Sequence, residues 1–321
     1  MAVEQRWQRG FAFLQLSLAE IEELIRPYAA GVRVFEATPL SGGLRNTNYR
    51  LRLSSQSAPV VLRLYSADPS ACPREVALTR LVEPSVPVPR VLHAQPAGSP
   101  PWAVMTWVDG VRFDEFMLTA TEPEVEAAAY SAGRVLAAIH TFQFPRSGFF
   151  GADLSVAAPF GPDDSWSSLL EGWLTRGRAG ARLGADLTPR LLQFIAGNAW
   201  RMEALSGQTS LLHADYKPWN LMLQDTAIAG VLDWEFAFCG SPLNDIGIFL
   251  RYSARQPPVY RTGFVNGYRA AGGDLPSEWP RLARMIDLIS LCYFLERPND
   301  DPALVNDVRS LIETTLDDFA P

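Results

Sequence analysis

A short polar stretch, HADYKPWN, lies between the apolar runs LL and LML of the chain. A plain turn needs fewer ionisable residues than this, so the side-chain types point to chemistry. The polar members are His213, Asp215, Lys217 and Asn220. Two further carboxylates, Asp233 and Glu235, follow the next apolar segment, GVL. Carboxylate and amide oxygens are the ligands that Mg²⁺ prefers, and a lysine ammonium is a compact cation suited to a phosphate.

A β-hairpin is the element that can bring these groups together. Short strands are expected at LML, residues 221 to 223, and AGVLDW, residues 229 to 234, with a turn between them. The second strand returns toward the polar loop and carries Asp233 and Glu235 with it. The sequence therefore predicts one site that combines the loop with the end of the hairpin.

The order of these residues resembles the kinase catalytic-loop pattern H-x-D-x-x-x-x-N, with a metal-binding aspartate downstream. Here DWE is followed closely by SPLNDIG, where a protein kinase has DFG, a long activation segment and APE. That combination is similar to the aminoglycoside phosphotransferase and choline kinase family. The resemblance runs from about Leu40 to about Leu291 and implies a protein-kinase-like fold that phosphorylates small alcohols.

The resemblance implies a role for each polar residue. Asp215 is expected to act as the catalytic base, and Lys217 to steady the transferred phosphoryl group. Asn220 and Asp233 are expected to hold Mg²⁺, with Glu235 assisting through water. The remaining two residues, expected to be structural supports of the loop, are His213 and Asp245.

The nucleotide clamps are expected in the first third of the chain. Arg63, in VVLRLY, stands where the family commonly has a strand lysine, and Glu75, in PREVAL, where a helix glutamate pairs with it. Arginine keeps the positive charge and adds a bidentate fork, so contact with phosphate is retained. The alternative is an ordinary surface salt bridge between a strand and a helix.

Two other segments complete the expected nucleotide site. SGGLRNTN, with Gly42 and Gly43, is expected to cover the phosphates, although it lacks the spacing G-x-G-x-x-G. An ordinary hairpin turn is the alternative for this pair. The strand segment MTWV, with Met105 and Trp107, is expected to form the hinge that meets the base.

The hydrophobic pattern predicts an α+β fold with two lobes. Residues 1–107 are expected to form an antiparallel sheet with one main helix, and residues 108–321 a larger, mainly helical lobe. The resemblance implies that the first is the nucleotide-binding lobe and the second the catalytic and substrate-binding lobe. Capping boxes at Ser17 and Thr121 mark helix starts. The expected strands are 49–53, 60–65 and 102–108, and the expected helices include 73–83, 124–140, 165–177 and 188–205.

Composition excludes several classes of protein. A formal net charge of −7 argues against nucleic-acid binding, which depends on Lys and Arg, and leaves room for a cationic small substrate. The 3 cysteines form no CxxC pair, so neither a disulfide framework nor a zinc site is expected. No apolar run of signal-peptide or membrane-spanning length is present, so no membrane association and a cytoplasmic location are expected. The sequence does not define an oligomeric state.

The prediction is therefore an ATP- or GTP-dependent phosphotransferase that uses Mg²⁺. Its acceptor is a small-molecule alcohol, with aminoglycosides, amino-alcohols and sugar-like compounds all admissible. A protein kinase is disfavoured because the distance from Asp233 to SPLND is too short for an activation segment. A non-catalytic nucleotide-binding module is disfavoured because Asp215, Asn220 and Asp233 are all present.

The acceptor is expected between the loop and the helices in residues 160–205 and 280–315. Tryptophans in or near these segments are candidates to line its pocket, although helical aromatic residues usually belong to the core. They are Trp166, Trp173, Trp200 and Trp219.

Overall fold

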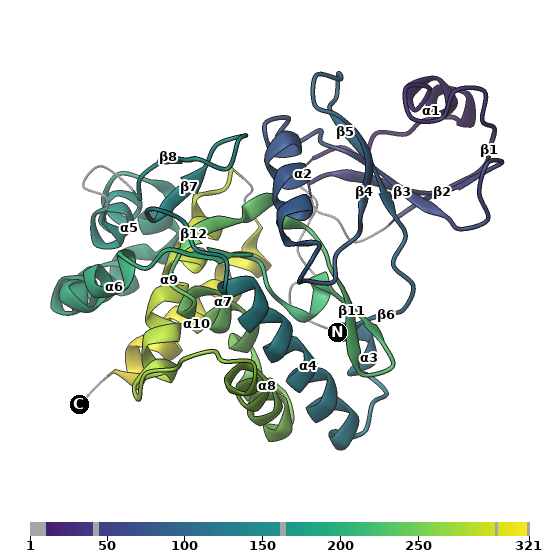
Figure 1. The fold of residues 1–321 in the computed structure, drawn as a ribbon. Helices are drawn as coiled ribbons and strands as arrows, with labels where there is room; N and C mark the ends of the chain where they lie inside the picture. The colour runs from purple at the N-terminus through teal and green to yellow at the C-terminus, as the bar shows by residue number, and fades with distance from the viewer. Residues whose placement is uncertain (1–10, 41–44, 161–164, 299–300, 320–321) are drawn as a thin grey trace.

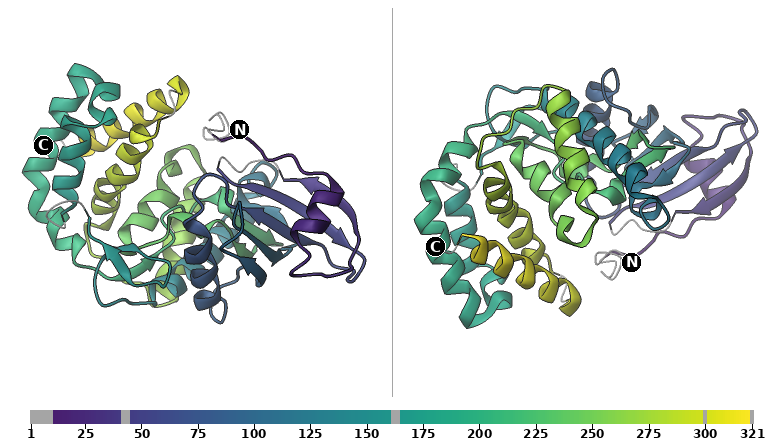
Figure 2. Two further views of the ribbon diagram at one scale, coloured as in Figure 1. Left: turned by 90° about the horizontal axis from the view of Figure 1, so that it is seen from above. Right: turned by 90° about the horizontal axis from the view of Figure 1, so that it is seen from below.

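The computed structural model describes residues 11–40, 45–160, 165–298 and 301–319. A sheet lobe, made of the elements α1 to β5 in chain order, packs against a helical lobe, made of the elements from β6 onward (Figure 1). Figure 2 shows the sheet lobe and the helices α6 and α10 at opposite ends of the molecule. The predicted α+β architecture is confirmed.

The sheet lobe is built on a 5-stranded antiparallel sheet with the order β1-β2-β3-β5-β4. Its strands are β1 (Val34–Pro39), β2 (Thr47–Leu53), β3 (Val60–Leu64), β4 (Val91–Gln95) and β5 (Trp102–Thr106). β2, β3 and β5 confirm the predicted strands. β4 was missed because the proline-rich segment before Val91 reads as a linker, and most of the residues in β4 are only partly buried.

Two helices cover opposite faces of this sheet. On one face α1 (Leu18–Leu24), capped by Ser17 as predicted, packs with Leu62 and Leu64 of β3. On the other face, residues of α2 (Ala71–Val82) pack with Ala103 and Met105 of β5. Because side chains alternate along a strand, Arg63 points to the face opposite Leu62 and Leu64, toward α2.

The helical lobe holds the larger hydrophobic core. Its helices are α3 (Phe113–Phe116), α4 (Glu122–His140), α5 (Trp166–Thr175), α6 (Arg178–Ser206), α7 (Leu243–Leu250), α8 (Pro258–Ala270), α9 (Trp279–Glu296) and α10 (Pro302–Asp318). α4 begins at the predicted capping box of Thr121 and Glu124. The glycine-rich segment expected to separate two helices belongs to α6 instead, and only Gly184, with φ of 79°, interrupts the helix.

Short strands form two small sheets around the polar loop. One contains β6 (Val111–Arg112) and the predicted hairpin, β10 (Leu221–Gln224) and β11 (Ala227–Val231). The other has the order β8-β7-β12-β9 and consists of β7 (Gly148–Phe150), β8 (Val156–Ala158), β9 (Ser210–Leu212) and β12 (Phe238–Gly240). Strands this short carry too little alternation to be recognised in a sequence. The polar loop directly follows one of these strands, β9.

Glycines let α4 and α8 approach each other closely. A Cβ on Gly133 of α4 would collide with the carbonyl oxygen of Phe264, and a Cβ on Gly267 of α8 would collide with the carbonyl oxygen of Tyr130. Both obstacles are backbone atoms, which cannot rotate away. This close contact fixes α4, whose last residue, His140, supports the site described below.

Gly267→Ala should lower the free energy of unfolding by about 1–3 kcal/mol, because the added methyl group forces the two helices apart. Gly197→Ala is the matched control, since Gly197 lies within α6 with no atom near the position of a Cβ. That change should stabilise the protein by about 0.5–1 kcal/mol. Urea denaturation of both variants measures the difference, and equal stabilities would contradict this view of the helix pair.

Candidate active site

The polar loop is fixed through its backbone by a buried aspartate. Asp245, in the first turn of α7, has no exposed surface. Its Oδ2 accepts a hydrogen bond from the His213 backbone N–H at 2.8 Å, and its Oδ1 from the Ala214 N–H at 2.7 Å. Ala214 has φ of 62°, a left-handed conformation that non-glycine residues seldom adopt. The two charge-assisted hydrogen bonds stabilise this strained turn.

Histidines support the loop from both sides. His213 is fully buried, and its Nδ1 accepts from the Asp215 N–H at 3.2 Å. The neutral ring therefore carries its proton on Nε2, which donates to the Leu232 carbonyl at 2.9 Å. His140 places Nε2 3.2 Å from Asp245 Oδ2 and Nδ1 2.9 Å from the Tyr268 hydroxyl. His140 is therefore a hydrogen-bonded core residue.

Asp215, Lys217 and Asn220 form one cluster at the surface of the loop. Lys217 Nζ lies 2.9 Å from Asp215 Oδ1. Asn220 Nδ2 donates to Asp215 Oδ2 at 2.7 Å and to the Asp215 carbonyl at 2.9 Å. These contacts orient the Asp215 carboxylate and leave Asn220 Oδ1 directed away from it. The structure thus brings together the loop residues predicted to do chemistry.

Asp233 connects the loop to the sheet lobe. It follows β11 with φ of 67° and ψ of 68°, a second left-handed residue. Arg63 Nη2 lies 2.5 Å from Asp233 Oδ1, and Arg63 Nε lies 3.0 Å from Glu75 Oε2. Glu75 Oε1 also accepts from the Trp234 backbone N–H at 3.3 Å. Arg63 and Glu75 are both buried, so the predicted pair is not a surface salt bridge.

The charges of this cluster stabilise one another. Burial lowers the pKa of Arg63, but the Glu75 and Asp233 carboxylates raise it to well above its ordinary value. Burial raises the pKa of Asp233, but the Arg63 charge outweighs it and holds this pKa below its ordinary value. The pKa of Glu75 is raised, since burial outweighs the attraction of Arg63. Arg63 and Asp233 are therefore a charged pair at neutral pH.

Glu235 contacts two residues at the start of the sheet lobe's second strand region, Arg45 and Asn46. Its Oε2 is 3.3 Å from Arg45 Nε and accepts from Asn46 Nδ2 at 3.1 Å. Burial and the charge of Asp233 raise the pKa of Glu235 to about 7, against the opposing effects of Arg63 and Arg45. Neither Arg45 nor Asn46 was expected to contribute here. The prediction for this segment concerned only Gly42 and Gly43, although the adjacent pair Arg45 and Asn46 is visible in LRNTN.

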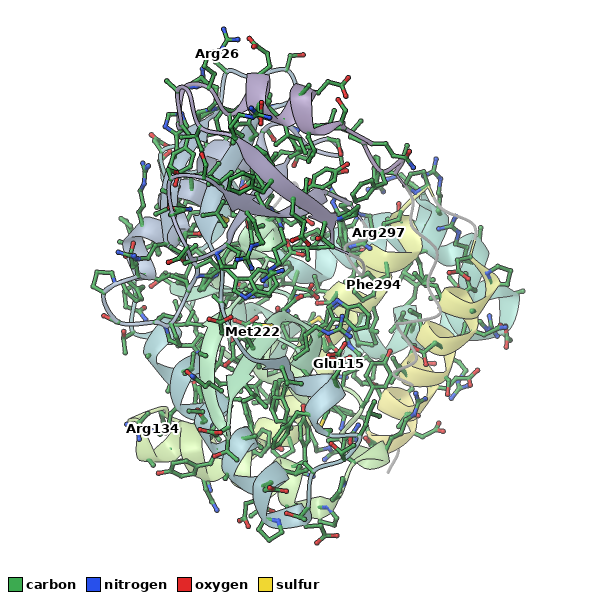
Figure 3. All side chains as sticks on the ribbon, turned by 90° about the vertical axis from the view of Figure 1, so that its right-hand side faces the viewer. Arg26, Glu115, Arg134, Met222, Phe294 and Arg297 are labelled. Carbon is green, nitrogen blue, oxygen red and sulfur yellow. The ribbon has the colours of Figure 1, made fainter. Side chains whose placement is uncertain are left out.

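A first cavity, of about 270 Å³, lies between the lobes. Arg63 and Glu75 line it from the sheet lobe, and Asn220 and Asp233 from the helical lobe. Met105 and Trp107, the predicted hinge residues, also line it, as does Met222 of β10, labelled in Figure 3. Arg112 stacks on the Trp219 ring at 3.8 Å in the same cavity and was not anticipated. Gly42 and Gly43 lie outside the described residues.

A second cavity, of about 370 Å³, lies on the other side of the loop. It is called the aromatic cavity below. Asp215 lines it together with Phe236 and Glu235, and Trp166 and Trp173 of α5 line it as well. Its far wall comes from α9, as expected for one of the two helical segments. Trp219 belongs to the first cavity, and Trp200 is 64% exposed on α6, so neither lines the aromatic cavity.

Other features of the described residues bear on cofactors and partners. Across these ranges no group of three or more His, Cys, Asp or Glu side chains is arranged to hold a metal ion. The helices that the structure describes include none with the length and hydropathy to cross a membrane. Cys72, Cys239 and Cys292 are free and buried, and burial raises the pKa of each thiol to about 12.

Comparison with known families agrees with this geometry. The model of the "Phosphotransferase enzyme family" matches residues 36–284, most of the chain. The chain belongs to the phosphotransferase enzyme family. Its identification as an enzyme that transfers phosphoryl groups, predicted from the loop, is thereby confirmed. No curated protein matches this phosphotransferase in sequence.

Solved structures share the fold of this phosphotransferase. Aminoglycoside phosphotransferase APH(4)-Ia aligns with a TM-score of 0.71 and 15% identity, covering 95% of this chain and all of the other (100%). APH(2")-IIa, solved with streptomycin and ATP, aligns with a TM-score of 0.65 and 18% identity, covering 96% and 100%. A putative aminoglycoside phosphotransferase from Ralstonia eutropha aligns with a TM-score of 0.63 and 18% identity, covering 94% of this chain and 98% of the other. The predicted protein-kinase-like two-lobed fold is confirmed.

Asp245→Asn should lower the free energy of unfolding of this phosphotransferase by about 2–3 kcal/mol. An amide offers one acceptor oxygen where the carboxylate has two, so a buried backbone N–H loses its partner. Asp317→Asn is the control, since the Asp317 side chain is 73% exposed, and should change stability by less than about 0.5 kcal/mol. Equal urea midpoints for the two variants would refute the assigned role of Asp245.

Proposed function

We propose that the chain transfers the γ-phosphate of Mg²⁺-bound ATP or GTP to a hydroxyl group of a small molecule. The observation that carries the proposal is the position of the loop between the cavities. Asp215 lines the aromatic cavity, while Asn220 and Asp233 line the first cavity. A nucleotide on one side and an alcohol on the other therefore meet at the loop.

The structural neighbours support a site that takes a nucleotide and a second small molecule together. APH(2")-IIa was solved with streptomycin and ATP, and a thermostable mutant of APH(4)-Ia with hygromycin B and either ADP or AMP-PNP. Each of those complexes combines a nucleotide with a polyhydroxylated molecule. We extend to this chain the nucleotide and the small hydroxylated acceptor, with residues 1–107 as the nucleotide lobe and 108–321 as the catalytic and acceptor lobe.

The first cavity suits a nucleotide. Apolar side chains of the hinge and of the hairpin, including Met105, Trp107 and Met222, offer surfaces for a flat base. Arg63 provides a charged guanidinium at the other end, where the phosphates would lie. Gly42 and Gly43 retain their proposed role as the loop over the phosphates.

Asn220 and Asp233 fit the requirements of Mg²⁺. This ion commonly takes one or two protein oxygen ligands and completes its octahedron with phosphate and water. The hydrogen bonds from Asn220 to Asp215 use Nδ2, so they leave Asn220 Oδ1 available to a metal ion. Arg63 contacts Oδ1 of Asp233, which leaves Oδ2 for the same purpose. Mg²⁺ bound there supplies charge neutralisation for the β- and γ-phosphates. Glu235 faces Arg45 and the aromatic cavity, so we leave it outside the ligand set.

Asp215 is the proposed base. The acceptor oxygen forms a bond to the γ-phosphorus, the bond from that phosphorus to the β,γ-bridging oxygen breaks, and the hydroxyl proton passes to Asp215. Lys217, 2.9 Å from Asp215, is placed to offset charge on the transferred group. The nucleoside diphosphate and the phosphate ester are the products. Catalysis here depends on positioning and charge, because the protein forms no covalent bond to the phosphoryl group.

A protein substrate is less consistent with the chain. η3 (Trp234–Phe236), β12 and α7, which starts at Leu243, follow Asp233 in close succession. No residues remain between them for a long activation segment. The aromatic cavity also has a volume that suits a small molecule.

Asp215→Asn should lower kcat by about a thousandfold or more, because the amide cannot accept the proton. Nucleotide affinity should remain close to that of the unchanged chain. The assay is ATP consumption over a panel of small alcohols. Asp225→Asn, an exposed change at the turn of the β10–β11 hairpin, is the control and should keep full activity. Undiminished turnover in Asp215→Asn would refute the proposed base.

Asp233→Asn should abolish the part of nucleotide affinity that depends on Mg²⁺. In the unchanged chain, calorimetry should detect binding of AMP-PNP at least about tenfold tighter with Mg²⁺ than with EDTA. In Asp233→Asn the two affinities should converge. Asparagine tolerates the left-handed conformation of this residue, so the fold should persist. A full Mg²⁺ effect in the variant would exclude Asp233 as a ligand.

A further inference from the structure

The charges around the aromatic cavity are unusual for a site that would receive a cation. Each of its carboxylates lies near a cation of the protein. The pairs are Asp215 with Lys217 at 2.9 Å, Glu235 with Arg45 at 3.3 Å, and Asp68 with Arg74 at 3.9 Å. Among the described residues, the cavity therefore offers no unpaired carboxylate to a substrate ammonium group.

Arg297, in contrast to these paired carboxylates, is a cation of the cavity without an ion-pair partner among the described residues. It follows the last residue of α9, lines the aromatic cavity, and is seen beside Phe294 in Figure 3. Its Nε is buried without a hydrogen-bond partner, and its side chain forms no ion pair with a carboxylate of the described residues. Burial lowers its pKa, although Tyr293 and Asp215 oppose this effect. The Arg297 side chain as a whole is partly buried. A partly buried cation without a close counter-ion loses some of its hydration, and an anionic ligand would offset that cost.

Aromatic rings hold the Arg297 guanidinium in place. It lies 4.8 Å from the centroid of Phe294, 5.3 Å from Tyr293 and 5.5 Å from Phe236. Such cation–π contacts fix its plane without using its N–H donors. The fork thus stays available for the two oxygens of a carboxylate.

The rest of the cavity defines the body of the ligand. Its walls include Phe149, Phe150, Trp166, Trp173 and Phe238. These side chains favour a ring or another apolar surface over a densely hydroxylated one. Asn244 also lines the cavity, and its Oδ1 is buried without a partner, so it can accept one hydrogen bond from a ligand hydroxyl.

We propose, on the basis of the function proposed above, that the acceptor is a hydroxylated carboxylic acid with an apolar, ring-containing body, and that Arg297 binds its carboxylate. The hydroxyl group faces Asp215, and the apolar body occupies the aromatic walls. Polycationic aminoglycosides fit this cavity poorly, because Arg297 repels them and the cavity carboxylates are already paired.

Three probes on one scaffold test the charge preference directly. They are 4-(hydroxymethyl)phenylacetate, its neutral amide 4-(hydroxymethyl)phenylacetamide, and the cation 4-(hydroxymethyl)phenethylamine. Each is titrated into the chain loaded with Mg²⁺ and AMP-PNP, with tryptophan fluorescence as the signal. The carboxylate should bind at least about tenfold tighter than either of the others. Equal affinities, or tighter binding of the cation, would overturn the proposal.

Arg297→Gln should weaken binding of the carboxylate probe by about 30-fold or more and leave the amide probe unchanged. Arg297→Lys should retain part of the preference, since it keeps the charge but loses the fork. Arg134→Gln, an exposed arginine of α4 far from Arg297 in Figure 3, is the matched control. An unchanged carboxylate affinity in Arg297→Gln would overturn the proposal.

Failure of this inference is distinguishable from failure of the proposed function. Arg297 lines only the aromatic cavity of the two, so Mg²⁺–AMP-PNP binding should be the same in Arg297→Gln and in the unchanged chain. If AMP-PNP does not bind to the unchanged chain, the proposed function fails. If AMP-PNP binds and the cation probe is preferred, only the assignment of the acceptor fails.

Discussion

The site depends on one buried carboxylate, Asp245, at the start of α7. Its two oxygens receive the backbone N–H groups of His213 and Ala214 and hold Ala214 in a left-handed conformation. That turn precedes Asp215, which lines the aromatic cavity. Such a buried charge is tolerated only because strong donors surround it, and His140 provides a further one from α4. The close packing of α4 on α8 thus contributes to the position of the loop.

Arg63 provides the second constraint, the connection between the lobes. It pairs with Glu75 within the sheet lobe and with Asp233 across the first cavity. The Glu75 and Asp233 carboxylates share the Arg63 guanidinium as their counter-ion. Moving the lobes apart would therefore leave the Asp233 carboxylate without the positive charge of Arg63. The loop and this pair together give a site with one cavity on each side of the loop.

Much of this arrangement was predictable from the sequence, and the exceptions have physical reasons. The loop residues were recognisable from their spacing and types, and the resemblance to a known family implied that Asp245 supports the loop. β4, β7, β8, β9 and β12 were missed because they are short or weakly alternating, and their pairing depends on distant segments. Arg45, Asn46, Arg112 and Arg297 were missed for a related reason. Apart from the RN pair in LRNTN, the local sequence does not mark these residues, since only the fold brings them to the cavities.

The central claim is that a Mg²⁺-nucleotide and an acceptor meet at the loop from opposite sides. A crystal structure of the chain with Mg²⁺ and AMP-PNP tests it most directly. We expect the base in the first cavity beside Met105 and Trp107, Mg²⁺ on Asn220 Oδ1 and the Asp233 carboxylate, and the γ-phosphate directed toward Asp215. Nucleotide bound in the aromatic cavity, or Mg²⁺ held by other residues, would contradict it.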